Sequence, residues 1–486
     1  MRLSELLREV EFEGSIKNDF DIKFVTDDSR LVRPGALFVC IRHRSFDGHT
    51  AAAEALASGA AAVVTQERLG LENELNVVDS RAAYARLCAA FCGHPERKLR
   101  MIGVTGTNGK TTVTTLIRNI LSDSGIKTLL TGTVCNRLGE ESLPSGLTTP
   151  KPPELYSLLS RAVLSGCEAC VAEASSQALA QGRLEGIAFD AAVFTNITRD
   201  HLDYHGTFEN YLAAKKKLFE HSEVSAVNLD DPRADEIIAA SSGKTVTFST
   251  VLDCADYTAK NISLLPEGVS FELVSKGRIE HINFASPGLF SVSNAMAAAV
   301  CAINLGVDPR SAAQSLARSK VVCGRLERVE CGTPYSVIID YAHTPDGLEQ
   351  VLRALRPSCR GKLIVLFGCG GDRDKTKRPL MGAVACKYAD TVIVTSDNPR
   401  SEEPMRIIGD ILKGTDKKRR GLFIEEDRRR ATALALSLAK PGDTVLLAGK
   451  GHEKYQLICG EKLPLDERET VREILGLPHD TGRKKP

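Results

Sequence analysis

The sequence contains no long run of apolar residues and carries almost no net charge. Its 486 residues include 63 basic and 62 acidic side chains, which gives a formal net charge of +1. No uninterrupted apolar stretch reaches the roughly 18 residues that a membrane-spanning helix needs, and the opening residues MRLSELLREVEFEG lack the apolar core of a signal peptide. The charge balance does not indicate nucleic acid or an anionic membrane as a partner. We therefore expect a cytoplasmic protein that neither binds nucleic acid nor inserts into a membrane.

The 14 cysteines are scattered and form no disulfide framework. A cytosolic chain of this length needs no disulfides, so most of them are expected to be small buried thiols. Cys167 and Cys170 have CxxC spacing, but the sequence lacks the second Cys or His pair that a zinc site requires. Because Cys170 also opens an apolar run, a buried strand is favoured over redox or zinc chemistry.

The length suggests about three domains, at roughly 100–200 residues each. The expected divisions are residues 1–98, 99–328 and 329–486. In the first, an Ala-rich helix at 50–58 lies between short strands at 36–41 and 61–65, and the polar stretch HPER at 94–97 is expected to be a linker.

The rest of the chain shows the alternation of strands and helices that is typical of parallel sheets. Residues 100–105 read as a strand, and after a Gly-rich turn the apolar residues recur at i, i+3, i+4, i+7 and i+8 from Val113, which predicts a helix. Further strands are expected at 128–134, 169–173, 191–196, 226–229, 335–340, 362–367, 391–395 and 443–447. We predict an α/β fold with a central P-loop-type parallel sheet and a C-terminal Rossmann-like sheet.

The segment GVTGTNGKTT at 103–112 joins the first of these strands to the helix. Glycines let backbone N–H groups close around phosphate oxygens, and a helix N-terminus adds partial positive charge. Lys110 is expected to reach the β- and γ-phosphates of ATP, and Thr111 to place its hydroxyl on Mg²⁺. The other expected nucleotide contacts of the loop are Gly106, Thr107, Asn108, Gly109 and Thr112. Val104 replaces the first consensus glycine, and the alternative is a Gly-rich turn without a ligand.

The spelling TGTNGKTT resembles the Mur ligase family and the related folylpolyglutamate synthetases, and the resemblance extends over essentially the whole chain. It implies three domains: one for a UDP-linked substrate, a central ATPase domain and a Rossmann-like C-terminal domain. It also implies an ATP-dependent ligase that forms an amide bond through an acyl phosphate. The C-terminal domain is expected to rotate onto the central one, and no general base can be assigned.

Three residues match the catalytic and Mg²⁺-binding positions of that family. Glu173 in AEASS resembles the ligand near the γ-phosphate, and His201 in TNITRDHLDYHG resembles the ligand of a second ion. Lys215 in YLAAKKKLF matches a lysine that CO₂ carboxylates, and a carbamate supplies the anionic oxygens that Mg²⁺ prefers. The alternatives are a solvated strand-end acid, a structural histidine and a solvated helix face. Successive helix residues point about 100° apart, so Lys216 and Lys217 are expected in solvent.

The resemblance also implies contacts to the nucleotide and to the UDP-linked substrate. Asn294 in SVSNAMAAA and Arg325 in GRLERV match residues beside adenine, and Asp340 in IIDYAHTPD matches a residue that the C-terminal domain brings to the nucleotide. Ser29, His43, Arg44 and Ser45 match uridine contacts, whereas Thr148, Thr149, Ser175, Gln181 and Arg183 match contacts to the muramoyl peptide. Taken alone, such residues are equally typical of helix caps, surface ion pairs and polar loops. Leu147 departs from the family, since some members carry Asn there.

The motif Asp397-Asn398-Pro399-Arg400 resembles the signature of family members that add meso-diaminopimelate. That amino acid differs from lysine by one extra carboxylate, which a planar guanidinium binds through two hydrogen bonds. Further matching contacts are Arg373, Gly449 and Glu453. The implied substrates are meso-diaminopimelate and UDP-N-acetylmuramoyl-L-alanyl-D-glutamate. The alternatives are another acceptor such as lysine, an NTPase or kinase without an amide product, and a non-catalytic homologue.

Overall fold

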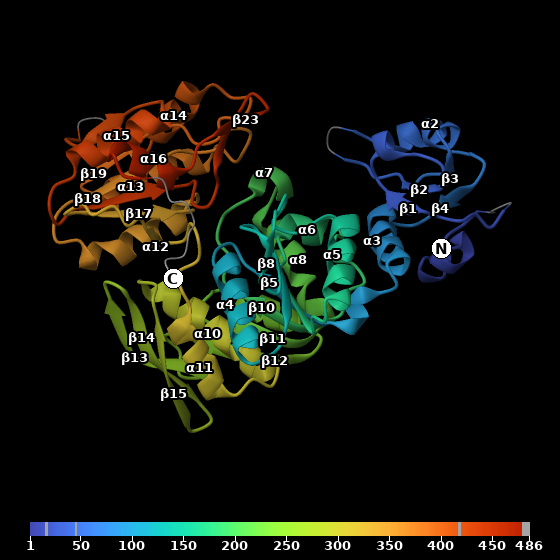
Figure 1. Ribbon diagram of the computed structural model, residues 1–486, viewed down its shortest axis with the longest axis horizontal. Coiled ribbons are helices and arrows are strands. Elements are labelled where there is room, and N and C mark those ends of the chain that lie inside the picture. Colours follow the sequence, from blue (N-terminus) through green and yellow to red (C-terminus); the bar gives the residue numbers. More distant parts are fainter. Residues whose placement is uncertain (15–17, 44–45, 417–418, 479–486) are drawn as a thin grey trace.

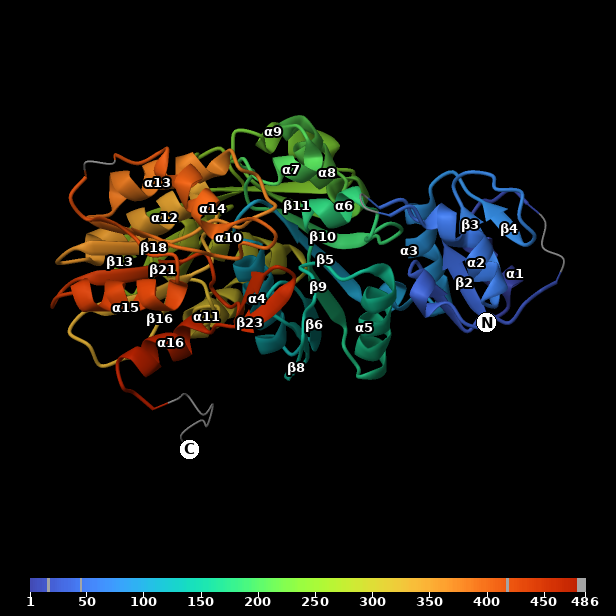
Figure 2. The ribbon, with the colours of Figure 1, turned by 90° about the horizontal axis from the view of Figure 1, so that it is seen from above.

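The three parts of the molecule follow one another in space as they do in the sequence (Figure 1). The computed structural model describes residues 1–14, 18–43, 46–416 and 419–478. The N-terminal part lies at one end, and the central part separates it from the C-terminal part in both views (Figure 2). The central part is therefore the one that can share a site with either neighbour. Among the helices of the described residues, none has both the length and the apolar character that a bilayer crossing demands.

The N-terminal part is built on a parallel sheet with the order β1-β2-β3-β4. Its elements are α1 (Leu3–Leu6), β1 (Phe24–Thr26), β2 (Ala36–Val39), α2 (Ala52–Ala57), β3 (Ala60–Thr65), β4 (Glu74–Asn76) and α3 (Ser80–Phe91). Strands β2 and β3 are buried along their whole length, as expected for uninterrupted apolar runs. The helix expected at 50–58 begins as the 3-10 turn Gly48–Ala51 and continues as α2.

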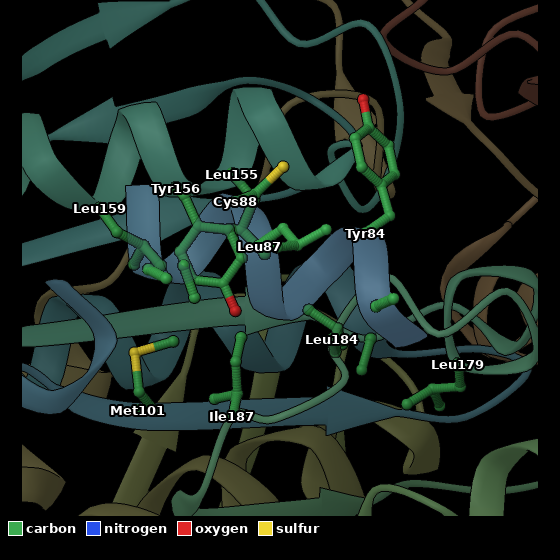
Figure 3. Packing of buried hydrophobic residues seen from close by; sticks show 14 of the residues in the cluster. Tyr84, Leu87, Cys88, Met101, Leu155, Tyr156, Leu159, Leu179, Leu184 and Ile187 are labelled. Carbon is green, nitrogen blue, oxygen red and sulfur yellow. The ribbon is translucent and has the colours of Figure 1, made fainter. Parts of the chain in front are cut away.

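Helix α3 ties the N-terminal part to the central part. Figure 3 shows Leu87 and Cys88 of α3 beside Leu155 and Tyr156 of α5 (Pro152–Leu164), and all four side chains are buried. The stretch at 94–97, expected to be a linker, belongs to the 3-10 helix Pro95–Lys98, which packs on α5 with its proline buried. Proline favours the first turn of a helical segment. The stretch connects the N-terminal and central parts, and it does so as a packed segment.

The central sheet has eleven strands in the order β15-β14-β13-β12-β11-β10-β5-β9-β6-β7-β8. They are β5 (Arg100–Thr105), β6 (Thr128–Thr131), β7 (Asn136–Leu138), β8 (Glu141–Leu143), β9 (Ala169–Glu173), β10 (Phe189–Phe194), β11 (Ser222–Asn228), β12 (Lys244–Ser249), β13 (Tyr257–Leu265), β14 (Gly268–Ser275) and β15 (Arg278–Phe284). The strands from β13 to β6 pair in parallel. Strand β5 lies between β9 and β10, so the loop after it opens at a switch point of the sheet, where ligands bind in such folds.

Antiparallel hairpins extend both edges of this sheet, and the sequence analysis did not anticipate them. Strands β14 and β15 continue one edge, and β7 and β8 continue the other. The strand expected at 128–134 ends at Thr131 because the chain turns back into β7. The helices are α4 (Lys110–Asp123), α5, α6 (Ser176–Ala180), α7 (Leu202–His205), α8 (Phe208–Lys216), α9 (Ala234–Ala240), α10 (Leu289–Asn304) and α11 (Pro309–Arg318). The predicted apolar face of α4 is buried, and α4 packs on α10.

The C-terminal part contains a six-stranded sheet with the order β16-β17-β21-β18-β19-β20 and a separate β22-β23 hairpin. The strands are β16 (Glu327–Arg328), β17 (Ser336–Asp340), β18 (Leu363–Phe367), β19 (Thr391–Val394), β20 (Leu422–Ile424), β21 (Thr444–Ala448), β22 (Tyr455–Ile458) and β23 (Glu461–Pro464). The helices are α12 (Pro345–Leu355), α13 (Lys377–Tyr388), α14 (Pro404–Leu412), α15 (Arg428–Leu438) and α16 (Glu467–Ile474). Alternate residues of β18 enter two different apolar cores. Both faces of the sheet are therefore covered, as predicted for a doubly wound fold.

Arg378 of α13 pairs its buried charge inside the C-terminal part. Its guanidinium donates to Glu402 at 2.8 and 3.0 Å and to Asp410 at 3.0 Å. The hydrogen bond from Arg378 is the main cause that lowers the pKa of Glu402 to about 2, from an ordinary value of 4.5. We expect Glu402→Gln to lower the free energy of unfolding by about 2 kcal/mol at neutral pH, because a buried guanidinium loses a charged partner.

The pH dependence of this effect follows from the direction of the shift. A carboxylate whose pKa is lowered by folding stabilises fully above its unfolded pKa and loses that contribution as the pH falls through the folded value. The stability gap between the parent protein and Glu402→Gln should therefore be widest above about pH 5 and should narrow toward about pH 2. Urea unfolding at several pH values measures it. A gap that stays constant across this range would contradict the assignment.

Candidate active site

The predicted phosphate loop joins β5 to the first residue of α4. Gly109 has a φ of +88°, and a Cβ at this position would lie 2.5 Å from Asn294 Oδ1, so only glycine fits. The N–H groups of Thr107 and Asn108 donate to Asn196 at 2.9 and 3.0 Å, which fixes the shape of the loop. The N–H groups in the first turn of α4 have no acceptor within the helix and are the ones able to hold an anion. Lys110 Nζ lies over the loop, donating to the carbonyl groups of residues 106 and 107 at 2.8 and 2.9 Å.

A cavity of about 630 Å³ extends from this loop to the C-terminal part. The loop, Glu173, His201 and Lys215 line one side of it, and Arg325 and Asp340 line the other. The lining also includes Asn294 and apolar side chains, among them Phe248, Val251, Phe284, Leu289 and Phe290. A phosphate loop together with an apolar, aromatic lining suits a nucleotide with a purine base. The sequence analysis named Asn294 but missed the aromatic residues, because they come from three separate elements.

Glu173, at the end of β9, lies directly beside Thr111 of α4. Thr111 Oγ1 donates to Glu173 Oε2 at 3.1 Å, and Arg325 Nη2 donates to Thr111 Oγ1 at 3.1 Å. Thr133 donates to both carboxylate oxygens, from N to Oε1 at 2.8 Å and from Oγ1 to Oε2 at 2.9 Å. Thr133 Oγ1 also donates to Thr148 at 3.1 Å. The two predicted Mg²⁺ ligands are thus neighbours, and both offer oxygen atoms.

His201 lies in the loop after β10, with a left-handed backbone at φ 53°. Its Nε2 is 3.4 Å from Asp200 Oδ2. Burial lowers the pKa of His201 to about 4, and the nearby cations Lys110 and Lys215 act in the same direction. The ring is therefore neutral at physiological pH and can offer a lone pair to a metal ion.

Lys215 on α8 is buried, with 1% of its surface exposed. Its Nζ lies 4.7 Å from the centre of the Tyr211 ring and 3.5 Å from Thr105 Oγ1. Burial is the main cause that lowers the pKa of Lys215 well below its ordinary value, and the charge of Lys110 adds to it. Lys216 is half-buried, and Lys217, the C-terminal cap of α8, is exposed. Of the three successive lysines, only Lys215 is thus both buried and beside the phosphate loop.

The predicted metal-binding residues form two pairs that differ in how well they suit Mg²⁺. Thr111 and Glu173 supply hard oxygen donors as they stand. His201 and Lys215 fit a second ion only when the lysine carries a carbamate, because an ammonium repels a cation. Within the described ranges, no three His, Cys, Asp or Glu side chains are grouped as a metal site.

The predicted contacts to the muramoyl peptide form one hydrogen-bonded group on the central part. Thr149 Oγ1 donates to the Glu173 carbonyl at 2.6 Å and accepts from Ser175 N at 3.1 Å. Arg183 donates to the Thr149 carbonyl at 2.8 Å and to Gln181 Oε1 at 2.7 Å. The structure therefore brings these residues together next to the predicted Mg²⁺ ligand.

The predicted uridine contacts lie on the N-terminal part. His43 Nε2 is 3.5 Å from Asp27 Oδ2, and the same carboxylate lies 3.3 Å from Lys151 Nζ of the central part. Ser29 begins a 3-10 turn that Asp28 caps. Arg44 and Ser45 are outside the described residues. Lys151 follows Thr149 by two positions, so a chain of polar groups leads from the N-terminal part to the phosphate loop.

Arg325 and Asp340 lie where the central part joins the C-terminal sheet. The Arg325 guanidinium stacks on the Tyr341 ring at 4.6 Å. The buried Asp340 carboxylate accepts from Leu326 N and from Ala342 N, both at 2.7 Å. These bonds show Asp340 fixing the backbone of the connection, and its contact with a nucleotide stays a prediction.

The side chains of Arg373 and Arg400 both approach Gly370 in the C-terminal part. A Cβ at Gly370 would be 2.8 Å from Arg400 Nη1 and 3.7 Å from Arg373 Cγ. Arg400 Nη1 donates to the Gly371 carbonyl at 2.8 Å, which holds the guanidinium in place. Burial lowers the pKa of Arg400, and the charge of Arg373 lowers it further. Two neighbouring guanidinium groups repel each other, and an anion bound between them relieves the repulsion.

Asn398, Glu453 and the fully buried Lys450 form a network beside these arginines. Lys450 Nζ donates to Asn398 Oδ1 at 2.8 Å and to Glu453 Oε2 at 2.7 Å, and Asn398 Nδ2 donates to the same carboxylate oxygen at 2.9 Å. A Cβ at Gly449 would lie 2.6 Å from Asp397 Oδ2, so this glycine allows β21 and the DNPR loop to approach closely. The sequence analysis missed Lys450. A lysine between two glycines directly after a buried strand was the signal for it.

Replacing Lys450 by Met should weaken use of the amino substrate while leaving nucleotide binding intact. The variant removes the donor that orients both Asn398 and Glu453. Losing a charge-assisted hydrogen bond costs about 1.5–3 kcal/mol, so the KM for the amino substrate should rise about 10- to 100-fold. Steady-state kinetics with that substrate varied, and nucleotide titration as a control, measure this. An unchanged KM would show that Lys450 does not contribute to binding of the amino substrate.

Family models match three segments of the chain. Residues 104–302 match the Mur ligase middle domain, residues 324–451 match the Mur ligase glutamate ligase domain, and residues 21–92 match the catalytic domain of the Mur ligase family. A relative from Syntrophomonas wolfei is 42% identical, over 98% of this chain and 99% of its own. A relative from Caldanaerobacter subterraneus is 44% identical over the same shares. The chain belongs to the Mur ligase family.

Both relatives of this Mur ligase are described as UDP-N-acetylmuramoyl-L-alanyl-D-glutamate–2,6-diaminopimelate ligases. A solved structure with the same description has a TM-score of 0.70 at 34% identity and covers 98% of this chain and 99% of that one. MurF from Thermotoga maritima in complex with ADP gives 0.63 at 21% identity, over 94% and 97%, and supports the fold alone. The three-domain α/β architecture predicted from the sequence is thereby confirmed.

Proposed function

We propose that this Mur ligase joins meso-diaminopimelate to UDP-N-acetylmuramoyl-L-alanyl-D-glutamate at the expense of ATP. The observation that supports the acceptor most strongly is that the side chains of Arg373 and Arg400 both approach Gly370, near the carboxylate of Glu453. The two arginines suit a carboxylate, and Glu453 suits an ammonium. The proposal includes a division into domains at 1–98, 99–328 and 329–486, and a cytoplasmic location, where ATP is supplied.

The reaction begins with attack of the peptide carboxylate on the γ-phosphate of ATP. Lys110 and the N–H groups at the start of α4 hold the phosphates, and Thr149 and Arg183 orient the peptide. Bound Mg²⁺, held by Thr111 and Glu173 and by His201 with carboxylated Lys215, would neutralise phosphate charge. A bond forms between the carboxylate oxygen and the γ-phosphorus, the bond from that phosphorus to the β-phosphate oxygen breaks, and ADP leaves, so the carboxylate becomes an acyl phosphate. This activation is needed because a free carboxylate does not react with an amine at a useful rate.

The neutral amine then attacks the acyl carbon, phosphate leaves with the bonding electrons, and the nitrogen releases one proton to give the amide. Glu453, Asn398 and Lys450 fix the amino-acid end of diaminopimelate, while Arg373 and Arg400 bind its distal carboxylate. Lysine has the distal ammonium without the carboxylate that accompanies it in diaminopimelate, so the two arginines would gain no partner and would repel it. The same contacts thus provide both binding and discrimination.

Phosphate release tests the proposed function. The purified protein is incubated with ATP, Mg²⁺ and the UDP-linked dipeptide, together with meso-diaminopimelate, L-lysine or no amine. Strong release with diaminopimelate alone is the expected result. Equal release with lysine would overturn the specificity, and release independent of any amine would favour an NTPase.

A further inference from the structure

Two loops from different parts of the chain meet beside the active-site cavity. The loop after β10 carries Asp200 and the predicted metal ligand His201, and the loop after β18 carries Arg373 and ends at Lys377, the first residue of α13. Lys377 Nζ lies 3.6 Å from Asp200 Oδ1. The proposed nucleotide side and the proposed acceptor side are therefore linked by a direct ion pair.

This ion pair is buried, which sets it apart from surface pairs. The side chains of Lys377 and Asp200 are 9% and 6% exposed. Exposed pairs contribute little because water screens them, whereas removing one partner of a buried pair leaves a charge without its counter-charge and is strongly destabilising. The contact therefore has enough energy to bias how the two loops sit against each other.

Helix α13 begins with two buried cations, and their partners lie in different places. Arg378 pairs with Glu402 and Asp410 of its own sheet. Across the described part of the chain, the ion pair of Lys377 is with Asp200 of the central part. A cation at a helix N-terminus opposes the helix dipole. Within the C-terminal part alone Lys377 is thus unfavourably placed, and docking onto the central part compensates it.

Other polar contacts cross the same interface. Arg199 Nη2 donates to Thr376 Oγ1 at 3.1 Å, and Asn108 Nδ2 of the phosphate loop donates to Asp346 Oδ2 of α12 at 3.0 Å. The residues next to Asp200 and Lys377 therefore reinforce the same docking.

We propose that Lys377 and Asp200 are positioning residues whose pairing holds the Arg373 loop against the metal-side loop while the amide bond forms. The inference rests on the proposed function. Closure delivers the amine and keeps water from the acyl phosphate. When the pair is broken, water attacks the acyl carbon, a C–O bond forms, the bond to the phosphate oxygen breaks, and carboxylate and phosphate are released. ATP is then consumed without amide formation.

The number of phosphates released per amide formed reports this coupling. In Lys377→Met we expect the ratio to rise from one to about 3 or more, and the KM for diaminopimelate to rise about tenfold, equivalent to 1.4 kcal/mol. The Kd for ATP should stay within about twofold, because positioning residues act on closure rather than on nucleotide binding. The matched control is Lys375→Met in the same loop, where the lysine is exposed and pairs with Glu402; its ratio should stay at one.

Two further variants test the same interface. Thr376→Val and Arg199→Met each remove the exposed hydrogen bond between these two residues. Each should raise the ratio of phosphate to amide, but less than Lys377→Met does. Both can be measured if Lys377→Met fails to fold. A ratio of one in all three variants overturns the proposal, and a large rise in the Kd for ATP in Lys377→Met means that Lys377 contacts the nucleotide instead. If the parent protein forms no amide, the proposed function fails. If the parent protein forms the amide and the variants show the same ratio of phosphate to amide, only the proposed coupling fails.

Discussion

Replacing Arg400 by Ala should lower kcat/KM for meso-diaminopimelate about 1000-fold, since two charge-assisted hydrogen bonds are worth about 4 kcal/mol together. The guanidinium donates a hydrogen bond to the Gly371 carbonyl, which holds it for this contact. The backbone N–H of Arg400 donates to the Leu457 carbonyl and fixes the backbone there. Steady-state kinetics with diaminopimelate varied measure the loss. Binding of ATP should be unchanged, because the phosphate loop lies on another part of the chain.

A matched control for this variant lies on the next helix. Arg406→Ala removes an exposed arginine of α14 that pairs with Glu403, and it should leave the kinetics unchanged. Use of L-lysine should improve relative to diaminopimelate in Arg400→Ala, because one repulsive charge is gone. If both amino acids lose activity equally, Arg400 supports the loop rather than reading the distal carboxylate.

Replacing Lys215 by Ala should lower the turnover number at least about 1000-fold, because a bound metal ion stabilises the transition state by several kcal/mol. The prediction depends on carboxylation of the buried amine. Lys217→Ala is the matched control, since Lys217 is exposed at the C-terminal cap of α8, and it should remain active. Comparable activity of both variants would show that turnover does not require a carbamate on Lys215.

The direction of the Lys215 pKa predicts how carboxylation depends on pH. CO₂ reacts with the neutral amine, and burial lowers the pKa so that more of the amine is neutral at a given pH. Carboxylation should therefore decrease as the pH falls and the amine becomes protonated. NMR of the protein with ¹³C-labelled bicarbonate should show a carbamate signal that weakens on acidification and is missing from Lys215→Ala. The same signal in that variant would assign it to another amine.

The parts of the fold that the sequence predicted well are those with uninterrupted periodic patterns. Strands β5 and β9 and helix α4 lie where the apolar spacing placed them, because a fully buried strand and an amphipathic helix leave strong signals. The hairpins β7-β8 and β14-β15 were missed. Strands β7 and β8 have only three residues each, which is too short for a periodic pattern, whereas the apolar residues of β14 and β15 do alternate and were overlooked. Packing of residues 95–98 on α5 was also missed, because a polar stretch gives no indication of what covers it.

In the site, motifs predicted which residues lie together but not what joins them. The loop after β5, Glu173 and Lys215 do converge on one cavity. Lys450, Asp200 and Lys377 were not singled out, because each depends on a partner far away in the sequence. A buried charge is recognised only when its counter-charge is known, and that requires the folded chain.

Transfer of ¹⁸O is the most direct test of the proposed acyl-phosphate ligation. The UDP-linked dipeptide is labelled with ¹⁸O in its reacting carboxylate and incubated with ATP, Mg²⁺ and meso-diaminopimelate. One ¹⁸O atom should appear in each phosphate released, together with an amide product of the expected mass. Unlabelled phosphate, or labelled phosphate without the amide, would contradict ligation through an acyl phosphate.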